Sequence, residues 1–94
     1  MKKRDVLEWL EQVVATHKAY LAALEKRNSK IRFCTINGIH VYKGIEYLAA
    51  AAEKKLEVKE RGCEQYPYEY WFEYKGMLIF QLNQEMGLEE VHFE

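Results

Sequence analysis

The chain lacks the residues and runs that mark several specialised classes of protein. Its two cysteines, Cys34 and Cys63, are too few for a disulfide framework. No apolar run approaches the roughly 18 residues that a membrane-spanning helix needs. The start MKKR resembles the basic region of a signal peptide, but Asp5, Glu8 and Glu11 follow where the apolar region would be required. We therefore expect a cytoplasmic protein whose cysteines are free thiols.

Motifs for catalysis and for cofactor binding are also missing. The sequence has no glycine-rich phosphate loop, no H-E-x-x-H zinc motif, no C-x-x-C pair and no nucleophile elbow. Two carboxylates, Glu69 and Glu73, share one face of a predicted strand, but nothing implies a cleft around them. We expect a protein that is not an enzyme and that uses no cofactor or metal.

Basic residues are scarce in the last third of the chain. Residues 62–94 carry 7 acidic side chains and a single basic one, Lys75, whereas residues 1–61 carry 13 basic and 8 acidic ones. The formal net charge of −1 hides this asymmetry. Two interpretations stay open. The two parts pack together and compensate each other, or an acidic surface attracts a basic partner or imitates a nucleic acid.

What the chain does contain is typical of a small globular protein. Its 94 residues make one domain, residues 1–94. Apolar residues make up 49% of the sequence and charged residues 31%, a balance that argues against disorder. A chain of this size can bury a modest core without disulfides or metals.

A long amphipathic helix is predicted from about residue 5 to residue 27. Asp5 and Glu8 have the spacing of a capping box at its start. Trp9 and Tyr20 lie at the edge of its apolar stripe. The stripe itself contains Val6, Leu7, Leu10, Val13, Val14, His17, Leu21 and Leu24. Such a helix is about 35 Å long, whereas a six-residue strand spans about 20 Å. The helix therefore either bends or packs its extra apolar turns against a second copy.

The rest of the chain predicts two β-hairpins separated by a second helix. Asn37-Gly38 between two β-rich runs signals the first hairpin, and a helix follows from Gly44 to about Lys55. The polar segment 57–65 predicts a loop with a short extended piece at its start, and the tail 84–94 contains a candidate edge strand, VHF. The order α-β-β-α-β-β predicts an α+β fold, with a four-stranded, mainly antiparallel sheet and two helices on one face.

The register of the second hairpin, in residues 66–82, decides which side chains reach the core. A two-residue loop at Lys75-Gly76 would pair Glu73 with Leu78 and place a carboxylate beside a predicted core residue, which is costly. A three-residue loop that begins at Tyr74 pairs Glu73 with Met77 instead. The hydrophobic pattern favours this three-residue loop. The inward residues are then Tyr68, Tyr70, Phe72, Leu78, Phe80 and Leu82.

An apolar outward face follows from this register, with Trp71 at its centre. The residues expected around Trp71 are Tyr42, His40, Met77, Ile79, Glu69, Glu73 and Gln81. Trp, Tyr and Met are enriched in protein interfaces, and contiguous exposed apolar patches usually mark interaction sites. We predict a partner-binding surface here, with a homodimer as the commonest outcome. The alternative is that the tail or the loop 57–65 covers this face and makes a second small core.

One pair of reactive side chains falls on the same face. Cys34 and His40 would lie opposite each other in the first hairpin. A histidine beside a thiol can activate it, or the pair can begin a metal site with Cys63 or His92. No third orienting group and no ligand spacing accompany the pair, which favours a chance proximity.

His17 and the basic run in residues 26–32 are two further candidates for a functional role. His17 lies on the apolar stripe of the first helix, where a lone histidine is typical of a packed core residue rather than of a ligand or a pH switch. The basic run in residues 26–32 would be able to contact phosphate. The expected binding face carries Glu69 and Glu73, however, so nucleic-acid binding is disfavoured.

The segments IHVYKGIEYLA (39–49) and YPYEYWFEYKGMLIFQL (66–82) resemble small uncharacterised proteins encoded by phages and mobile elements of Gram-positive bacteria. In those proteins a hairpin and a short helix precede a Tyr-Pro turn, an aromatic strand, a glycine turn and a phenylalanine-rich strand. The resemblance carries no activity and no site residues. It implies a context, because small phage proteins of this size often act by binding a host protein, including components of bacterial defence systems.

Together these observations predict a small non-enzymatic protein-interaction module that binds a partner through the open face of its sheet. The acidic last third of the chain would attract a host protein with a basic surface. The alternative is a small-molecule or nucleotide-binding module that uses the same face or a dimer cleft.

Overall fold

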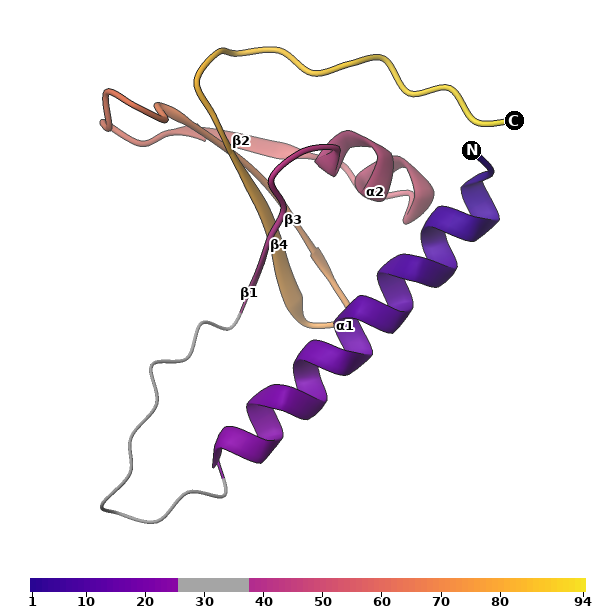
Figure 1. The fold of residues 1–94 in the computed structure, drawn as a ribbon. Helices are drawn as coiled ribbons and strands as arrows, with labels where there is room; N and C mark the ends of the chain where they lie inside the picture. The colour runs from indigo at the N-terminus through magenta and orange to yellow at the C-terminus, as the bar shows by residue number, and fades with distance from the viewer. Residues whose placement is uncertain (26–37) are drawn as a thin grey trace.

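Two helices and a four-stranded sheet form the α+β fold that the sequence predicts (Figure 1). The computed structural model describes residues 1–25 and 38–94. The elements in chain order are α1 (Lys3–Glu25), β1 (Gly38–His40), α2 (Ile45–Ala51), β2 (Glu57–Glu60), β3 (Tyr68–Tyr74) and β4 (Met77–Asn83). The described order is therefore α-β-α-β-β-β.

The sheet has the strand order β1-β4-β3-β2 and is mainly antiparallel, as predicted. β3 pairs antiparallel with both β2 and β4, while β1 pairs parallel with β4. The strand predicted before Asn37 lies outside the described residues. The fourth strand of the described sheet is instead Glu57–Glu60, where we expected a loop with a short extended start. All four residues of β2 are exposed. Its sequence, EVKE, has a single apolar residue, so no apolar alternation marks it as a strand.

The predicted three-residue loop between β3 and β4 is wrong. Tyr74 pairs with Met77, which leaves the two-residue turn Lys75-Gly76. Both turn residues have positive φ, 50° and 79°, as a type I′ hairpin turn requires. The one-residue difference turns every side chain of β4 to the opposite face.

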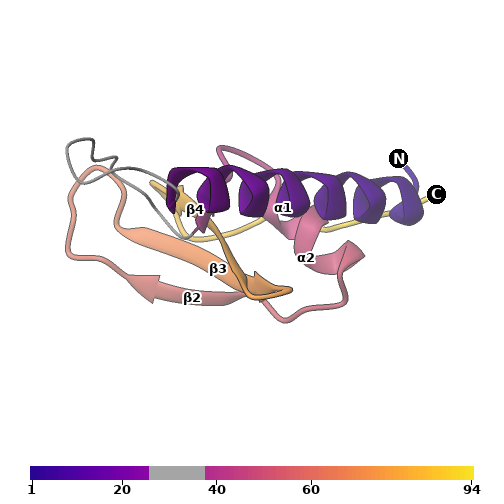
Figure 2. The same ribbon diagram turned by 90° about the horizontal axis from the view of Figure 1, so that it is seen from below.

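The core lies between the sheet and the two helices, which cover the same face of the sheet, as predicted (Figure 2). α1 contributes three buried residues at helical spacing: Val6, Leu10 and Val14. α2 contributes Ile45, Leu48, Ala49 and Ala51, and the sheet contributes Tyr70, Phe72, Tyr74, Met77 and Ile79. α1 begins at Lys3, so Asp5 lies in its first turn and is not the predicted cap. α2 ends at Ala51, earlier than predicted.

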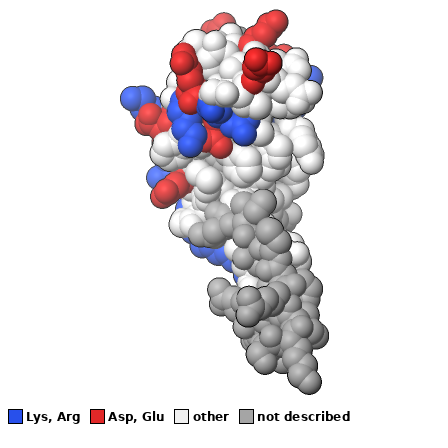
Figure 3. Space-filling model, turned by 90° about the vertical axis from the view of Figure 1, so that its left-hand side faces the viewer, with Lys and Arg blue, Asp and Glu red and all other residues white. Residues whose placement is uncertain are grey.

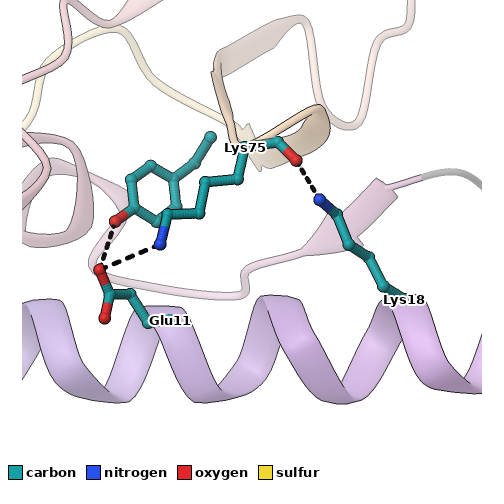
Figure 4. Close-up of polar contacts among 4 residues, drawn as sticks. Glu11, Lys18 and Lys75 are labelled. Atoms are coloured by element: carbon teal, nitrogen blue, oxygen red, sulfur yellow. Dashed lines mark hydrogen bonds and ion pairs between the residues drawn. The ribbon is translucent and has the colours of Figure 1, made fainter.

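The second half of α1 extends past the end of the sheet, as its predicted length requires (Figure 1). Polar contacts join the middle of the helix to the β3–β4 turn (Figure 4). The Tyr74 hydroxyl donates to Oε1 of Glu11 at 2.9 Å, and Nζ of Lys75 lies 3.3 Å from the same oxygen. Nζ of Lys18 donates to the carbonyl oxygen of Lys75. These contacts hold α1 against the hairpin beside its last buried residue, Val14, and one turn beyond it at Lys18.

The tail after β4 is irregular and lies along α2 on its way to the N-terminus (Figure 1). The backbone N–H of Gly87 donates to the Tyr70 hydroxyl, and the N–H of Glu89 donates to Oε2 of Glu46, both at 3.0 Å. The N-terminal amine forms an ion pair with Glu94 at 3.0 Å. The edge strand expected at VHF is absent from the described tail. Neither described helix is long and apolar enough to cross a membrane.

Candidate interaction surface

The face of the sheet that points away from the helices is apolar at its centre. Its side chains follow from the strand registers, and we call this set the outer face: His40, Glu57, Lys59, Glu69, Trp71, Glu73, Leu78, Phe80 and Leu82. Trp71, Leu78, Phe80 and Leu82 are half-buried, yet none of them packs against the core cluster. They lie on the outer face and do not fill the interior.

The middle of the outer face is a row of four side chains, one from each strand. The registers pair His40 with Phe80, Phe80 with Trp71, and Trp71 with Glu57. The rings of His40 and Phe80 stack nearly parallel, with centroids 4.8 Å apart and an interplanar angle of 6°. The ring of Tyr42 continues the row beyond β1, 4.8 Å from His40. Aromatic side chains thus occupy the central row on three of the four strands, β1, β4 and β3.

The predicted contact residues divide between the two faces of the sheet. Trp71, His40, Glu69 and Glu73 lie on the outer face, as expected, and Tyr42 is 88% exposed next to it. The placement predicted for the other two contact residues is wrong. Met77 and Ile79 are 1% and 0% exposed and belong to the core, because the two-residue turn points them inward.

Sequence reasoning assigned Leu78, Phe80 and Leu82 to the core, but they lie on the outer face. Gln81, expected on the outer face, is 5% exposed among core residues. The signal that would have found this arrangement is the Lys75-Gly76 pair, if it is interpreted as a two-residue turn.

Neither segment that was expected to close this face packs on it. The described tail runs along α2, on the helix side, through its contacts to Tyr70 and Glu46. Part of the segment 57–65 forms β2 and widens the sheet. The remainder closes on itself at the end of the β2–β3 hairpin, where N–H of Arg61 donates to the Pro67 carbonyl at 2.7 Å. In residues 1–25 and 38–94, therefore, no element forms a second core over the outer face.

Charges of both signs surround the apolar centre. Nζ of Lys59 lies 3.1 Å from Oε2 of Glu69, and the Glu69 side chain is only 18% exposed. Figure 3, which views the molecule from the left-hand side of Figure 1, shows acidic and basic side chains intermixed in its upper part. The Lys59–Glu69 ion pair supports the interpretation that basic residues before residue 62 compensate acidic residues after it.

Apart from the outer face, a groove of about 530 Å³ lies between α1 and the segment that joins β1 to α2. Its lining is mostly apolar and includes Val6, Trp9, Val13, Tyr42, Tyr47 and Leu48. Trp9 is 62% exposed, although the sequence placed it only at the edge of the helix stripe. The groove is within the size range of small-molecule sites.

The remaining candidates are two cysteines, two histidines and a basic run. The Cys34–His40 pair and the basic run 26–32 lie outside the described residues, at least in part. Cys63 is exposed in the loop after β2, where backbone N–H groups of Tyr66 and Gln65 lower its pKa. His17 is partly exposed on α1, with its ring 6.2 Å from that of Tyr20. No three metal-ligating side chains of the described residues converge on one point.

Comparisons with known proteins return no relative. No family model, no curated protein and no solved structure matches the chain.

Proposed function

We propose that this chain is a small non-enzymatic protein-interaction module that binds its partner through the outer face. The observation that carries the proposal is the pairing of Trp71 with Phe80 at the centre of a sheet face on which no described element packs. Leu78 and Leu82 extend this apolar centre along β4. Contiguous apolar surface of this kind is typical of interaction sites.

The composition of the face fits a protein partner better than a nucleic acid. Aromatic side chains are rigid and large, and they dominate the binding energy of many interfaces. Glu57, Glu69 and Glu73 border the rings, while Lys59 is the one lysine or arginine among the described residues of the outer face. A nucleic-acid surface would normally be basic. We therefore expect a partner with an apolar patch bordered by hydrogen-bonding and basic groups.

The resemblance to phage proteins gives the proposal a setting. We expect the partner in the lysate of a Gram-positive bacterium, as a host protein or a component of a defence system. The wild type and Trp71→Ala would be immobilised, and the proteins that each retains would be identified by mass spectrometry. Trp9→Ala is the matched control, because it removes an equally large exposed ring from α1.

The proposal predicts a protein retained by the wild type and by Trp9→Ala but lost with Trp71→Ala. All three proteins must first show the same circular dichroism spectrum. Retention by Trp71→Ala at the wild-type level would overturn the assignment of the outer face. A large loss of stability in Trp71→Ala would show that Trp71 is structural, and Phe80→Ala would then take its place in the same comparison.

The groove beside Trp9 favours a second candidate function, small-molecule binding. Its volume of about 530 Å³ and its aromatic lining suit an apolar or aromatic ligand. A thermal-shift screen tests this directly, since a ligand that binds the folded state raises the melting temperature. A hit that is lost in Trp9→Ala and kept in Trp71→Ala would assign ligand binding to the groove.

A further inference from the structure

The side chains of the central row are arranged so that the row complements itself when it is reversed. The row runs from His40 on β1 through Phe80 and Trp71 to Glu57 on β2. At about 4.8 Å between strands, its two ends are about 14 Å apart. Read from the other end, the row places an acid opposite the histidine and an aromatic ring opposite each aromatic ring.

We infer that the outer face also binds a second copy of this chain, related by a two-fold axis that lies between the two sheets and runs parallel to the strands. This inference rests on the proposed function and adds self-association through the same face, in which the second copy and the host protein compete for one surface. The axis places Phe80 of one copy against Trp71 of the other, and His40 against Glu57, and each contact occurs twice. Two sheets packed in this way are aligned, with their side chains interdigitating across about 10 Å.

Charge distinguishes this arrangement from the other symmetric one. An axis perpendicular to the strands would place Glu57 on Glu57 and Glu69 on Glu73 of the second copy, so that acidic groups repel one another. With the axis parallel to the strands, the acidic half of the outer face on β3 and β2 covers the half on β4 and β1. Outer-face positions on β4 and β1 carry no acidic residue.

The carboxylates that meet apolar residues in this dimer retain other partners. Glu73 is exposed and lies in the row nearest the turn, so it remains at the solvated rim. Glu69 keeps its ion pair with Lys59 at 3.1 Å. The face is three residues long and four strands wide, which is small for an interface. We therefore expect a dimer that dissociates on dilution in the micromolar range.

Sedimentation equilibrium tests the inference on the wild type and on charge variants. In His40→Glu, the new carboxylate faces Glu57 of the other copy and the two repel each other. In Glu57→Lys, the carboxylate that faces His40 of the other copy is lost. Each change occurs twice per dimer. We expect each to raise the dimer dissociation constant by about tenfold or more. The double variant His40→Glu/Glu57→Lys again places an acidic group opposite a basic one, and we expect it to return the constant to near the wild-type value. Within one chain the two side chains are too far apart to affect each other strongly.

Cross-linking gives a second measurement that does not depend on affinity. In a Cys34→Ser/Cys63→Ser background, His40→Cys/Glu57→Cys should be joined between chains by a bis-maleimide long enough to cross the sheet separation of about 10 Å, which is too wide for a disulfide. The two positions of one chain, about 14 Å apart, are beyond the reach of the same reagent. The control pair Glu57→Cys/Glu73→Cys, whose members do not face each other across the axis, should cross-link much less.

A wild type that is monomeric at every concentration would overturn the second-copy inference. The proposed function would still be decided by the lysate experiment, where Trp71→Ala alone loses the partner. A dimer that survives both His40→Glu and Trp71→Ala would show that self-association uses another surface. A double variant that stays as weak as the single ones would overturn the arrangement around the axis.

Discussion

Glu11 on α1 and Tyr74 at the end of β3 are joined by a hydrogen bond of 2.9 Å, in which the tyrosine hydroxyl donates to the carboxylate. The Tyr74 hydroxyl, and after it the ammonium of Lys75, hold the pKa of Glu11 below its usual range. The pair connects the helix to the β3–β4 turn where α1 leaves the sheet. Ionised Glu11 therefore helps to hold the long helix against the hairpin.

Stability should depend on the ionisation of Glu11 at acidic pH. A carboxyl whose pKa is lower in the folded state stabilises that state above its unfolded pKa, and the contribution disappears as pH falls through the folded pKa. We expect the melting temperature of the wild type to exceed that of Glu11→Gln near pH 7, by an amount that shrinks between pH 5 and pH 3. Thermal unfolding at low salt over this range measures the difference. A constant difference would show that the ionised pair contributes nothing.

The two faces of β4 can be tested by paired substitutions. Ile79 is 0% exposed, so Ile79→Ala should lower the free energy of unfolding by about 2–5 kcal/mol. Leu78 lies on the outer face, and Leu78→Ala should cost less than about 1 kcal/mol. Urea denaturation of both variants gives the comparison. Equal losses, or a larger loss for Leu78→Ala, would support the three-residue turn instead.

Sequence reasoning placed β3 correctly and β4 in reverse for a physical reason. β3 alternates, because the buried aromatics Tyr70 and Phe72 are separated by half-buried Trp71 and flanked by Glu69 and Glu73. The first four residues of β4, Met77 to Phe80, are all apolar, so alternation cannot say which face they occupy. The choice then rested on an expected penalty, the placement of Glu73 beside Leu78 and of Glu69 beside Leu82. That penalty does not arise, since neither leucine is in the core.

The remaining differences come from tertiary pairing, which a sequence pattern does not record. The parallel pairing of β1 with β4 joins strands that are about 40 residues apart in the chain, and no turn motif signals it. The apolar stripe of α1 was visible because the helical period repeats over several turns. Of the candidate site, Trp71, His40 and both glutamates could be predicted. Phe80 could not, because its position depends on the register.

A third prediction concerns the two-residue turn between β3 and β4. Gly76 has a φ of 79°, and a Cβ added there would meet no atom within 4 Å. The cost of Gly76→Ala is therefore conformational, about 1–2 kcal/mol, since a side chain disfavours positive φ. Equilibrium unfolding of Gly76→Ala measures it. Gly62→Ala is the matched control. Gly62 also has a positive φ, 71°, and no atom within 4 Å of an added Cβ, but it lies in a loop and not in the β3–β4 turn. An unchanged stability in Gly76→Ala would contradict the type I′ turn.

Gln81 provides the last prediction, because it stabilises the start of α2 from within the sheet. Gly44 precedes the helix and offers no side-chain cap, and the N–H of Ile45 donates instead to Oε1 of Gln81 at 3.0 Å. The amide nitrogen of Gln81 donates to Oδ1 of Asn83 at 2.9 Å, so both ends of this buried amide are satisfied. Gln81→Leu keeps the volume but removes the acceptor.

A buried N–H left without an acceptor costs about 1–3 kcal/mol, and we expect Gln81→Leu to lower the free energy of unfolding by that amount. Hydrogen exchange of the Ile45 amide should also accelerate, because α2 is short and this bond closes its first turn. Gln84→Leu, at an exposed position just after β4, is the control and should change neither quantity. A Gln81→Leu variant as stable as the wild type would mean that apolar packing at this site offsets the lost hydrogen bond. The polar residue would then be needed for the placement of α2 rather than for stability.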